Sequence, residues 1–466
     1  MAATAPLLAL DALGPDGAYH AYDRQVITDV GGAPLAELSL VPRLFVTRAM
    51  AALHAAPTLA RDARLTALAR AGEMYASGVV DGVSAAEHEL MVSRTSGMPI
   101  SVVRAAVQAI ARSASEAYES VRQARPLGDV EDWRDPLTAD GRGVWTRRGD
   151  VFAVHAPGNH PGVHALWLEA LALGYRVAVR PSRRDPFTPH RLITALRASG
   201  FAPDQVVLLP TGYEAADELV RGADLAMAYG GDEVMRRYAA NATMLPQGPG
   251  RSKILLTADV DWREHLDVIV ASISSQGGRA CVNTTAVFAE RDAAELARAI
   301  AQRLAAIPSL PPEDDRAVLP VLPLAEARRI EQHLLARAQG ALPWLGGDGI
   351  VDELGDGSAV LRPAVHELDR PEAEQAAVEL SFPCVWVAPW TRAAGIAPLR
   401  NTLVLTAITG DGGLLDALVD EPTISNVYVG DYPTDWMRPG VPHDGYLGGF
   451  LMRSKGMIRG QVAPTA

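Results

Sequence analysis

The sequence predicts an α/β protein built on doubly wound parallel sheets. Short apolar strands alternate with amphipathic helices from Val151 onward, and a second alternating stretch runs from about Ile254 to Val429. Strands that alternate with helices of roughly 10–15 residues are typical of βαβ crossovers and of mainly parallel sheets. The chain has 466 residues, of which 48% are hydrophobic and 21% charged, so it is long enough for two or three globular domains.

Composition excludes several classes of protein. The formal charge of −12 argues against nucleic acid or an anionic membrane as a partner, because binding there relies on Lys and Arg. Two cysteines, Cys281 and Cys384, are too few for a disulfide scaffold and fit a reducing compartment. The apolar N-terminus lacks a basic flank, and no apolar run reaches about 18 residues. We therefore expect a cytoplasmic protein without a membrane span.

The first quarter of the chain is predicted to be helical. The segment 60–78 places Leu65, Leu68 and Met74 on one helical face. Ser84 and Glu87 have the spacing of a capping box, in which each side chain satisfies a backbone N–H of the first turn. A third helix is expected over 101–125, and the three helices together predict a packed helical layer.

The first parallel sheet is predicted from four strands, each followed by a helix. They cover 151–155, 176–180, 206–209 and 225–229. The carboxyl ends of parallel strands share one rim, where α/β proteins bind their ligands. No G-x-G-x-x-G motif follows any of them, so a bound nucleotide would be held in another way. Between the helical layer and this sheet, the polar segment 126–148 predicts a projecting loop or hairpin.

Cys281 is the first candidate for chemistry. It ends the segment Gly-Gly-Arg-Ala-Cys at 277–281, between a predicted helix and the strand 284–288. On such a turn the thiol can face a substrate, and nearby backbone N–H groups can stabilise an oxyanion. Most free cysteines are instead small buried apolar residues. The residues alone leave both interpretations open.

Further polar residues follow the strands of the first sheet. Asn159 is either an amide aimed at the rim or an ordinary turn residue, and Pro161 suits the first turn of a helix. Arg180, Arg183 and Arg184 end the next strand, and they predict either a phosphate or carboxylate site or a solvated cluster. Three nearby histidines lack a carboxylate or cysteine to complete a metal site, so no metal is expected.

Six motifs in this order and spacing resemble those of the aldehyde dehydrogenase superfamily. Pro157-Gly-Asn-His-Pro161 resembles Pro-Trp-Asn-Phe-Pro, Arg180-Pro-Ser-Arg183 resembles Lys-Pro-Ser-Glu, and Tyr229-Gly-Gly-Asp232 stands for Phe-Thr-Gly-Ser. Gln247-Gly-Pro-Gly-Arg-Ser252 stands for Glu-Leu-Gly-Gly-Lys-Ser, Gly278-Arg-Ala-Cys281 for Gly-Gln-x-Cys, and Phe382-Pro-Cys-Val385 for Phe-Gly-Pro-Val. The resemblance implies a nucleotide-binding domain (1–126 and 148–256), a catalytic domain (257–428), and bridging segments (127–147 and 429–466).

The resemblance also implies a role for each matching residue. Cys281 would be the nucleophile, and the Asn159 amide with the Cys281 backbone N–H would form the oxyanion hole. Cys384 falls in a packing segment and is the less favoured nucleophile. The nicotinamide nucleotide would contact residues from both domains: Arg180, Ser182, Arg183, Gly230, Gly231, Glu379 and Phe382.

One departure from the family pattern directs the functional prediction. Gln247 stands where the family has the glutamate that activates water, and a carboxamide cannot accept a proton near neutral pH. An acyl group on Cys281 would then persist until hydride or a thiol reaches it. This predicts NAD(P)H-dependent reduction of an acyl thioester to an aldehyde. The segments 230–233, 248–252 and 442–446 are also similar to the acyl-CoA reductase branch, which includes the fatty-acyl reductase of bacterial luminescence.

Three other functions remain open. The chain could oxidise an aldehyde to an acid with another residue activating water. It could instead be a catalytically silent binding protein, or a cysteine acyltransferase without hydride chemistry. The reductase reading implies an acyl group carried by CoA or by an acyl carrier protein.

Two further departures concern the nucleotide and the assembly. Arg183 replaces the family glutamate that binds the ribose hydroxyls, which predicts a preference for NADP(H), with NAD(H) as the alternative. Asp232 replaces a serine that faces the pyrophosphate, and its charge would oppose phosphate. Ten residues follow Gly456, fewer than the terminal strand that many members use in oligomer contacts. A homodimer is still expected.

Overall fold

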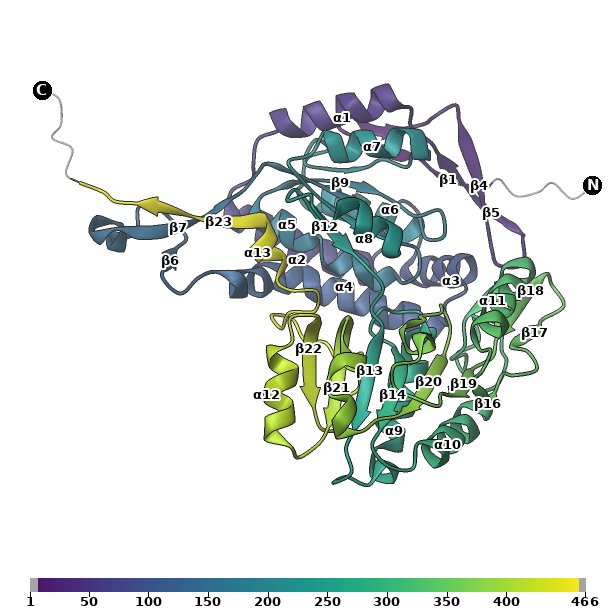
Figure 1. Ribbon diagram of the computed structural model, residues 1–466. Coiled ribbons are helices and arrows are strands. Elements are labelled where there is room, and N and C mark those ends of the chain that lie inside the picture. The colour runs from purple at the N-terminus through teal and green to yellow at the C-terminus, as the bar shows by residue number, and fades with distance from the viewer. Residues whose placement is uncertain (1–6, 461–466) are drawn as a thin grey trace, which may run out of the picture.

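The computed structural model describes residues 7–460, and it contains two seven-stranded sheets in the upper and lower halves of Figure 1. In the first sheet the strand order is β12 (Met244–Gln247), β11 (Leu225–Tyr229), β8 (Val151–His155), β9 (Arg176–Arg180), β10 (Val206–Leu208), β2 (Ala12–Gly14) and β3 (Gly17–Tyr19). Neighbouring strands from β12 to β10 are parallel, and β2 and β3 add an antiparallel edge.

Helices cover both faces of the first sheet because its strands are apolar on both sides. Val151 and Ala153 of β8 belong to the core on one face, and Phe152 and Val154 to the core on the other, as the two-residue period of a strand requires. One face packs against α1 (Arg43–Ala55) and α7 (Tyr213–Arg221). The other packs against α2 (Arg61–Ser77), α4 (Ile100–Val121), α5 (Leu168–Leu173) and α6 (Phe187–Ser199).

The second sheet repeats this plan. Its order is β16 (Leu342–Leu345), β19 (Ala364–Glu367), β20 (Cys384–Pro389), β14 (Thr284–Ala289), β13 (Ser252–Leu256), β21 (Thr402–Ile408) and β22 (Ile424–Val429), with only β16 antiparallel. Ile254 faces a core shared with α9 (Leu266–Ser274) and α10 (Ala293–Ala305). Leu255 faces the core shared with α11 (Leu324–Arg337) and α12 (Gly412–Asp420).

The two mainly parallel sheets confirm the predicted fold class. The structure also contains the capping box at the start of α3 (Ala85–Ser96), where the Glu87 N–H donates to Ser84 Oγ and the Ser84 N–H donates to Glu87 Oε2. Helix α10 has the bounds expected from its periodicity, 293–305. These helices are marked by local caps and periodic apolar residues, which act within one turn of the chain.

The helical prediction for the first quarter is wrong before Arg43. Strands β1 (Leu8–Leu10), β5 (Pro34–Ser39) and β4 (Arg24–Thr28) form a small sheet in that order, and β2 and β3 join the first large sheet. The three-residue strands β1, β2 and β3 carry almost no periodic signal, because three residues show a single alternation. They are held instead by partners distant in sequence, as β2 is by β10.

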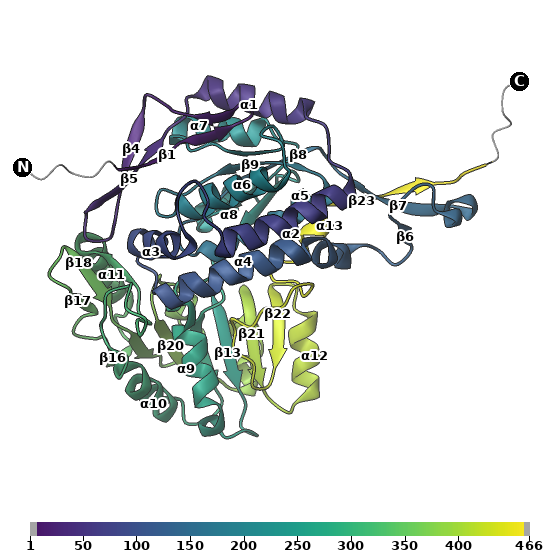
Figure 2. The ribbon, with the colours of Figure 1, turned by 180° about the vertical axis from the view of Figure 1, so that it is seen from behind.

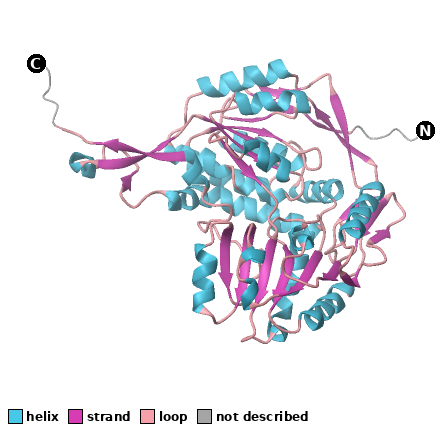
Figure 3. Ribbon diagram, viewed as in Figure 1, coloured by secondary structure: helices cyan, strands magenta, loops and turns pink. Residues whose placement is uncertain are grey.

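A narrow arm projects from the body of the protein, as Figures 1 and 3 show. It contains β6 (Asp129–Val130), the turn Pro136–Asp140 and β7 (Arg142–Arg147). The expected projection of 126–148 is present, but β7 pairs antiparallel with β23 (Met452–Met457), which follows α13 (Leu447–Leu451). The arm therefore joins segments about 300 residues apart, and sequence spacing alone could not reveal that pairing.

The junction between the sheets is where a site can form. The loop at the carboxyl end of β8 and the turn that precedes β14 are joined by hydrogen bonds, described below. Seen from behind, α4 and α2 cross the molecule between the two sheets (Figure 2). Near this junction α8 (Asp232–Tyr238) follows β11. Another small sheet consists of β15 (Val321–Pro323), β18 (Ser358–Leu361) and β17 (Val351–Glu353), in that order. Among residues 7–460, no helix has the length and apolar character needed to cross a membrane.

Candidate active site

Cys281 lies on a tight turn whose backbone few sequences can adopt. Gln276, Gly277 and Gly278 all have positive φ, at 54°, 66° and 64°. A Cβ atom on Gly278 would lie 2.3 Å from the backbone nitrogen of Pro383, so a side chain does not fit there. The turn thus requires glycine at Gly278 for both conformation and space. It ends at Cys281, a half-buried residue.

Neighbouring groups hold this turn in place. Asn283 Oδ1 accepts the Ala280 N–H at 2.9 Å, and Asn283 Nδ2 donates to the carbonyls of Ser272 and Ser275. Gly250 lies against the Cys281 carbonyl so closely that a Cβ there would be 1.7 Å from the oxygen. Asn283 was not among the predicted site residues. Asn283 stands two residues after the cysteine, in a turn whose backbone N–H and carbonyl groups need partners. That position is the signal that could have identified it.

The structure brings Asn159 beside the cysteine turn. Its Nδ2 donates to the Arg279 carbonyl at 3.1 Å, across the junction between the sheets. An amide nitrogen carries two hydrogens, so one N–H is available for another acceptor. The next residue adds a second link, because His160 Nε2 lies 2.9 Å from Gln276 Oε1. The loop after β8 and the cysteine turn are therefore joined at two points.

Arg279 anchors the same turn to the helical layer. Its guanidinium is buried and donates to the Ser96 carbonyl at the end of α3. Burial, with the nearby charge of Arg184, lowers the pKa of Arg279 to about 10. The helical layer thus contributes to positioning the turn, although it supplies no predicted site residue.

An imidazole and a carboxylate face Cys281 from the loop after β22. His443 Nδ1 lies 2.8 Å from Asp444 Oδ2, and the His443 ring interacts with the Cys281 thiol. His443 Nε2 is buried and has no hydrogen-bond partner among the described residues, so it is the ring nitrogen left over for the thiol. These two residues were absent from the predicted site. Their segment, 442–446, had been noted only for its resemblance to the reductase branch.

At this cluster, burial and the neighbouring groups shift the pKa values of the thiol and the imidazole in opposite directions. Burial raises the pKa of the Cys281 thiol, and its hydrogen bond and charge interaction with His443 lower it. Burial would lower the pKa of His443, but its interactions with Asp444 and Cys281 raise it to about 10. Burial also raises the pKa of Tyr229, and the charges of Asp444 and Cys281 add to that shift. Tyr229 therefore belongs to the surroundings of the thiol.

The Gln247 side chain is buried, although its sequence position predicts a residue of the active site. The residue is buried at the end of β12, and its amide Nε2 has a weak 4.0 Å contact with the Met227 sulfur. Its backbone carbonyl accepts the Gly230 N–H at 3.0 Å. The side chain is thus directed at the core of the first sheet.

The predicted nucleotide residues lie at the carboxyl rim of the first sheet and around the junction. Arg180 donates to the Thr211 carbonyl, Arg183 is exposed, and Ser182 Oγ accepts the Arg184 N–H. Gly230 packs tightly, with a Cβ there 2.3 Å from Val234, whereas a Cβ on Gly231 would meet nothing within 4 Å.

The charge of Asp232, which would oppose a phosphate, is offset in the structure. Arg251 Nη2 donates to both of its carboxylate oxygens, at 2.8 and 2.7 Å. The Arg251 backbone N–H donates to Glu379 at 2.7 Å, so that carboxylate is already bound by the chain. Arg251 thereby links the predicted nucleotide rim to the segment before β20.

A cavity of about 160 Å³ lies next to the cysteine turn. Its lining includes Asn159, Arg279, Glu379 and Phe382, while Cys384 lies buried at its inner side. Burial raises the pKa of Cys384 well above the usual range for a thiol. Cys384 is therefore a packed, protonated thiol, as the sequence predicts.

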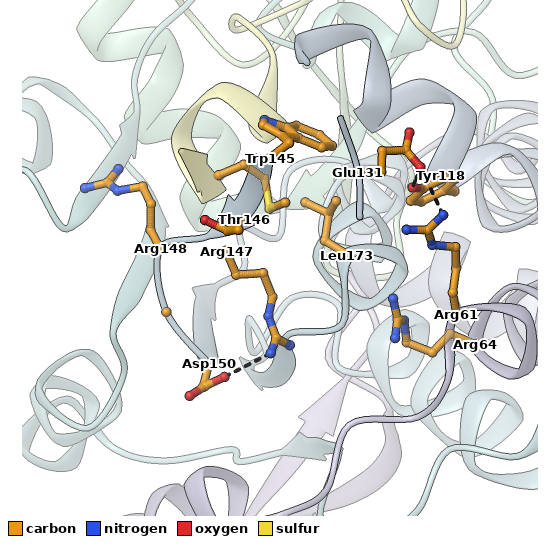
Figure 4. Close-up of a pocket in the computed structure, with 12 residues that line it drawn as sticks. Arg61, Arg64, Tyr118, Glu131, Trp145, Thr146, Arg147, Arg148, Asp150 and Leu173 are labelled. Carbon is orange, nitrogen blue, oxygen red and sulfur yellow. Dashed lines mark hydrogen bonds and ion pairs between the residues drawn. The ribbon is translucent and has the colours of Figure 1, made fainter. Parts of the chain in front are cut away.

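A second cavity, of about 520 Å³, lies at the base of the arm (Figure 4). Four arginines line it, and two of them are paired there, Arg61 with Glu131 at 2.9 Å and Arg147 with Asp150 at 3.2 Å. No predicted site residue lines this larger cavity. Its size therefore does not identify the site of chemistry. Within residues 7–460, no group of three or more His, Cys, Asp or Glu side chains is arranged to hold a metal.

Known proteins resemble this chain in sequence over most of its length. The sequence model of the aldehyde dehydrogenase family matches residues 31–446. A 2-hydroxymuconic semialdehyde dehydrogenase from Pseudomonas sp. (strain CF600) is 23% identical over 290 residues, 57% of this chain and 59% of that protein. The chain thus spans about three fifths of the length of this relative.

Solved structures agree on the fold. An indole-3-acetaldehyde dehydrogenase from P. syringae, solved with NAD⁺, has a TM-score of 0.83 at 18% identity and covers 98% of both chains. A glyceraldehyde-3-phosphate dehydrogenase from Methanocaldococcus jannaschii, solved with NADP, has a TM-score of 0.78 at 15% identity and covers 93% of this chain and 98% of the other.

These comparisons contradict the prediction of an acyl-thioester reductase. The matched proteins are named as aldehyde and semialdehyde dehydrogenases, which favours aldehyde oxidation over thioester reduction. Nothing in them supports an acyl-CoA or acyl carrier partner. The prediction gave most weight to the glutamine at position 247; the comparisons favour the alternative that the sequence left open, aldehyde oxidation with another residue activating water.

Proposed function

The chain belongs to the aldehyde dehydrogenase family, and we propose that it oxidises an aldehyde to a carboxylic acid with a nicotinamide dinucleotide as the oxidant. One observation carries this proposal: the Cys281 turn is fastened to the Asn159 loop across the junction of the two sheets. A nucleophile and an amide donor from different domains therefore meet in one place.

The residues at the junction have the chemistry that this reaction needs. Cys281 Sγ adds to the aldehyde carbon, and the spare N–H of Asn159 with the Cys281 backbone N–H stabilises the resulting oxyanion. A bound nicotinamide dinucleotide supplies the hydride acceptor. Water then releases the acid from the thioester on Cys281.

The nucleotide fits the first sheet and its helices, which we propose as the nucleotide-binding domain. The space beside Gly231 is open, and Arg251 neutralises Asp232 at the same rim. Arg180, Ser182 and Arg183 supply cationic and hydroxyl groups at the end of β9, and Glu379 and Phe382 border the cavity next to Cys281.

Steady-state oxidation tests the activity directly. The purified protein is mixed with a panel of aldehydes and NAD⁺ or NADP⁺ without added thiol, and nucleotide reduction and acid formation are both measured. Semialdehydes enter the panel first, because the matched relative carries that name. We expect turnover that Cys281→Ser abolishes and Cys384→Ser retains. Activity that appears only after a thiol acceptor is added would contradict the proposal.

We also propose a preference for NADP⁺ over NAD⁺. Arg183 is exposed at the carboxyl end of β9, where a cation can pair with a 2′-phosphate. Arg183→Glu is expected to lower kcat/KM for NADP⁺ and to raise or retain it for NAD⁺. Arg48→Glu makes the same charge change on the exposed face of α1 and serves as the control. An unchanged ratio in Arg183→Glu would rule out this role.

A homodimer remains our proposal for the assembly. The arm formed by β7 and β23 extends from the body, and β23 is an edge strand of its sheet. Edge strands offer unpaired backbone groups to a second chain. Sedimentation of the full chain tests this, and a monomer at micromolar concentration would count against it.

A further inference from the structure

The proposed function gives no role to the pair His443 and Asp444. The imidazole Nδ1 lies 2.8 Å from the carboxylate, the ring interacts with the Cys281 thiol, and Nε2 is buried without a partner among the described residues. Thiol, imidazole and carboxylate in series are the arrangement by which a base activates a nucleophile and a third group orients the base. Three residues from two loops therefore form a complete series.

Independent contacts place His443 at this position. Asn426 Nδ2 donates to the Leu403 carbonyl at 2.8 Å and also to the His443 carbonyl. Leu403 belongs to the small apolar cluster against which Cys281 packs. The backbone that carries the imidazole is thus tied to the wall beside the thiol, and its location does not depend on the ring contact alone.

Among the described residues, Gln247 and Glu379 are less suited to accept a proton than His443. Gln247 is an amide, and its side chain is buried against Met227. The Glu379 carboxylate is bound by the Arg251 N–H. Acid formation from a thioester needs a base to activate water, so the proposed function requires another acceptor.

We propose that His443 is the general base of this site: Nε2 takes the proton from Cys281 Sγ and later from the attacking water, while Asp444 orients the ring through Nδ1. The second role rests on the proposed function, whereas the first concerns the free enzyme. Nε2 is the nitrogen assigned to both roles, because Nδ1 lies against Asp444 and Nε2 is buried without a hydrogen-bond partner among the described residues.

The proton transfers balance over one turnover. Sγ–H gives its proton to Nε2, the thiolate forms a bond to the aldehyde carbon, and the carbonyl becomes an oxyanion. Hydride leaves that carbon for the dinucleotide oxidant, the oxyanion reforms a carbonyl as a thioester, and His443 releases its proton to solvent. His443 then takes a proton from water, hydroxide adds to the thioester carbon, and the carbon–sulfur bond breaks to give thiolate and the acid.

The charges around the pair are consistent with this role. The Cys281 thiol interacts with His443, Asp444 and Glu379, and only His443 favours the thiolate. Tyr229 lies within electrostatic range of both Cys281 and Asp444. Because burial raises the pKa of the thiol and the imidazole opposes that rise, removing the ring will leave the thiol harder to ionise.

Alkylation of the free enzyme tests the first role without nucleotide or aldehyde. Modification of Cys281 by iodoacetamide is followed by intact mass over a range of pH, with Cys281→Ser to identify the site. We expect His443→Gln to slow alkylation at neutral pH about tenfold or more and to move the midpoint of the pH profile upward, since each unit of pKa changes the thiolate fraction tenfold.

A matched control comes from a second pair in the same domain. His265 lies 3.1 Å from Asp431, and no described contact joins it to Cys281. His265→Gln should alkylate like the wild type. His443→Asn provides a second variant, and both His443 variants are compared with the wild type by thermal melting. Wild-type alkylation in a folded His443 variant would overturn the proposal.

Hydrolysis of p-nitrophenyl acetate tests the second role, again without nucleotide. The wild type should acylate Cys281 and release acetate repeatedly. In His443→Gln the acetyl enzyme should accumulate and persist, visible as a mass adduct. Unchanged release of acetate would overturn the role in water activation. Because neither assay needs an aldehyde, failure of aldehyde oxidation would contradict the proposed function while leaving this result standing.

Discussion

Asn159 shows how much of the site depends on one side chain. It reaches across the junction to the Arg279 carbonyl at 3.1 Å, and its second N–H is the donor that we propose for the substrate oxygen. Removal of one oxyanion donor typically costs about 10²–10³ in kcat. We expect Asn159→Ala to lower kcat of aldehyde oxidation by that factor and to leave the melting temperature nearly unchanged.

A second asparagine provides the control for this variant. Asn241 is exposed in the turn before β12, where its Oδ1 accepts only the backbone N–H and the hydroxyl of Thr243 among the described contacts. Asn241→Ala makes the same truncation away from the cysteine turn, so kcat should match the wild type. An equal loss of kcat in the two variants would contradict the role of Asn159 as an oxyanion donor.

His164 makes stability depend on pH. Burial lowers its pKa to about 3, and its Nδ1 accepts the Trp167 indole N–H at 3.0 Å. Between this pKa and about 6.5 the unfolded chain binds a proton that the folded chain does not, so stability falls as pH decreases through that window. The contribution is at most about 1.4 kcal/mol per pH unit.

Urea unfolding measured at neutral and at mildly acidic pH tests this contribution. His164→Gln should lose less stability on acidification than the wild type, although it starts from a lower value. His333→Gln, on the exposed face of α11, should follow the wild type. Equal losses in His164→Gln and the wild type would show that His164 is not the source.

Helix α3 illustrates an element whose start is determined locally. Ser84 and Glu87 satisfy each other's backbone N–H groups, and Gly97 ends the helix in a left-handed conformation. Loss of the cap costs about 1 kcal/mol. Ser84→Ala should therefore raise hydrogen exchange in the first turns of α3 about fivefold. Ser115→Ala, in the exposed middle of α4, removes a hydroxyl that caps no helix and should leave α3 unchanged.

The whole molecule depends on a close contact at Gly97, where α3 meets β15. The Val321 N–H donates to the Gly97 carbonyl at 2.9 Å, and a Cβ on Gly97 would lie 1.7 Å from the Val321 carbonyl oxygen. The helical layer and the small sheet beside the second large sheet are joined at this point. A side chain there must push the two parts of the protein apart.

Gly97→Ala is accordingly expected to destabilise the fold strongly. Gly82→Ala is the matched control, because Gly82 also has positive φ (77°) but nothing lies within 4 Å of its Cβ position. Gly82→Ala should cost about 1 kcal/mol from backbone conformation alone. Gly97→Ala should cost several times more, with a lower melting temperature and lower aldehyde oxidation. Equal costs for the two variants would contradict the importance of this contact.

Local patterns along the chain were enough to predict the features that arise within a few turns. The alternation of strands and helices predicts two parallel sheets, the capping box predicts the start of α3, and periodic apolar residues predict α10. The order of six motifs identifies the family, and the glycines before Cys281 mark its turn. Each of these signals is local, because hydrogen bonds of caps and turns and the periods of helices and strands involve residues close in sequence.

Only the tertiary structure decides which groups distant in sequence come into contact. The fold pairs β7 with β23, joins β2 to β10, buries Gln247 against Met227, and brings His443 to Cys281 across more than 150 residues of chain. The position of the proposed base could not be inferred from residue 247, because it depends on which side chains the fold brings near the thiol. The loop after β22 is held beside β21 by Asn426, and no local pattern encodes that packing.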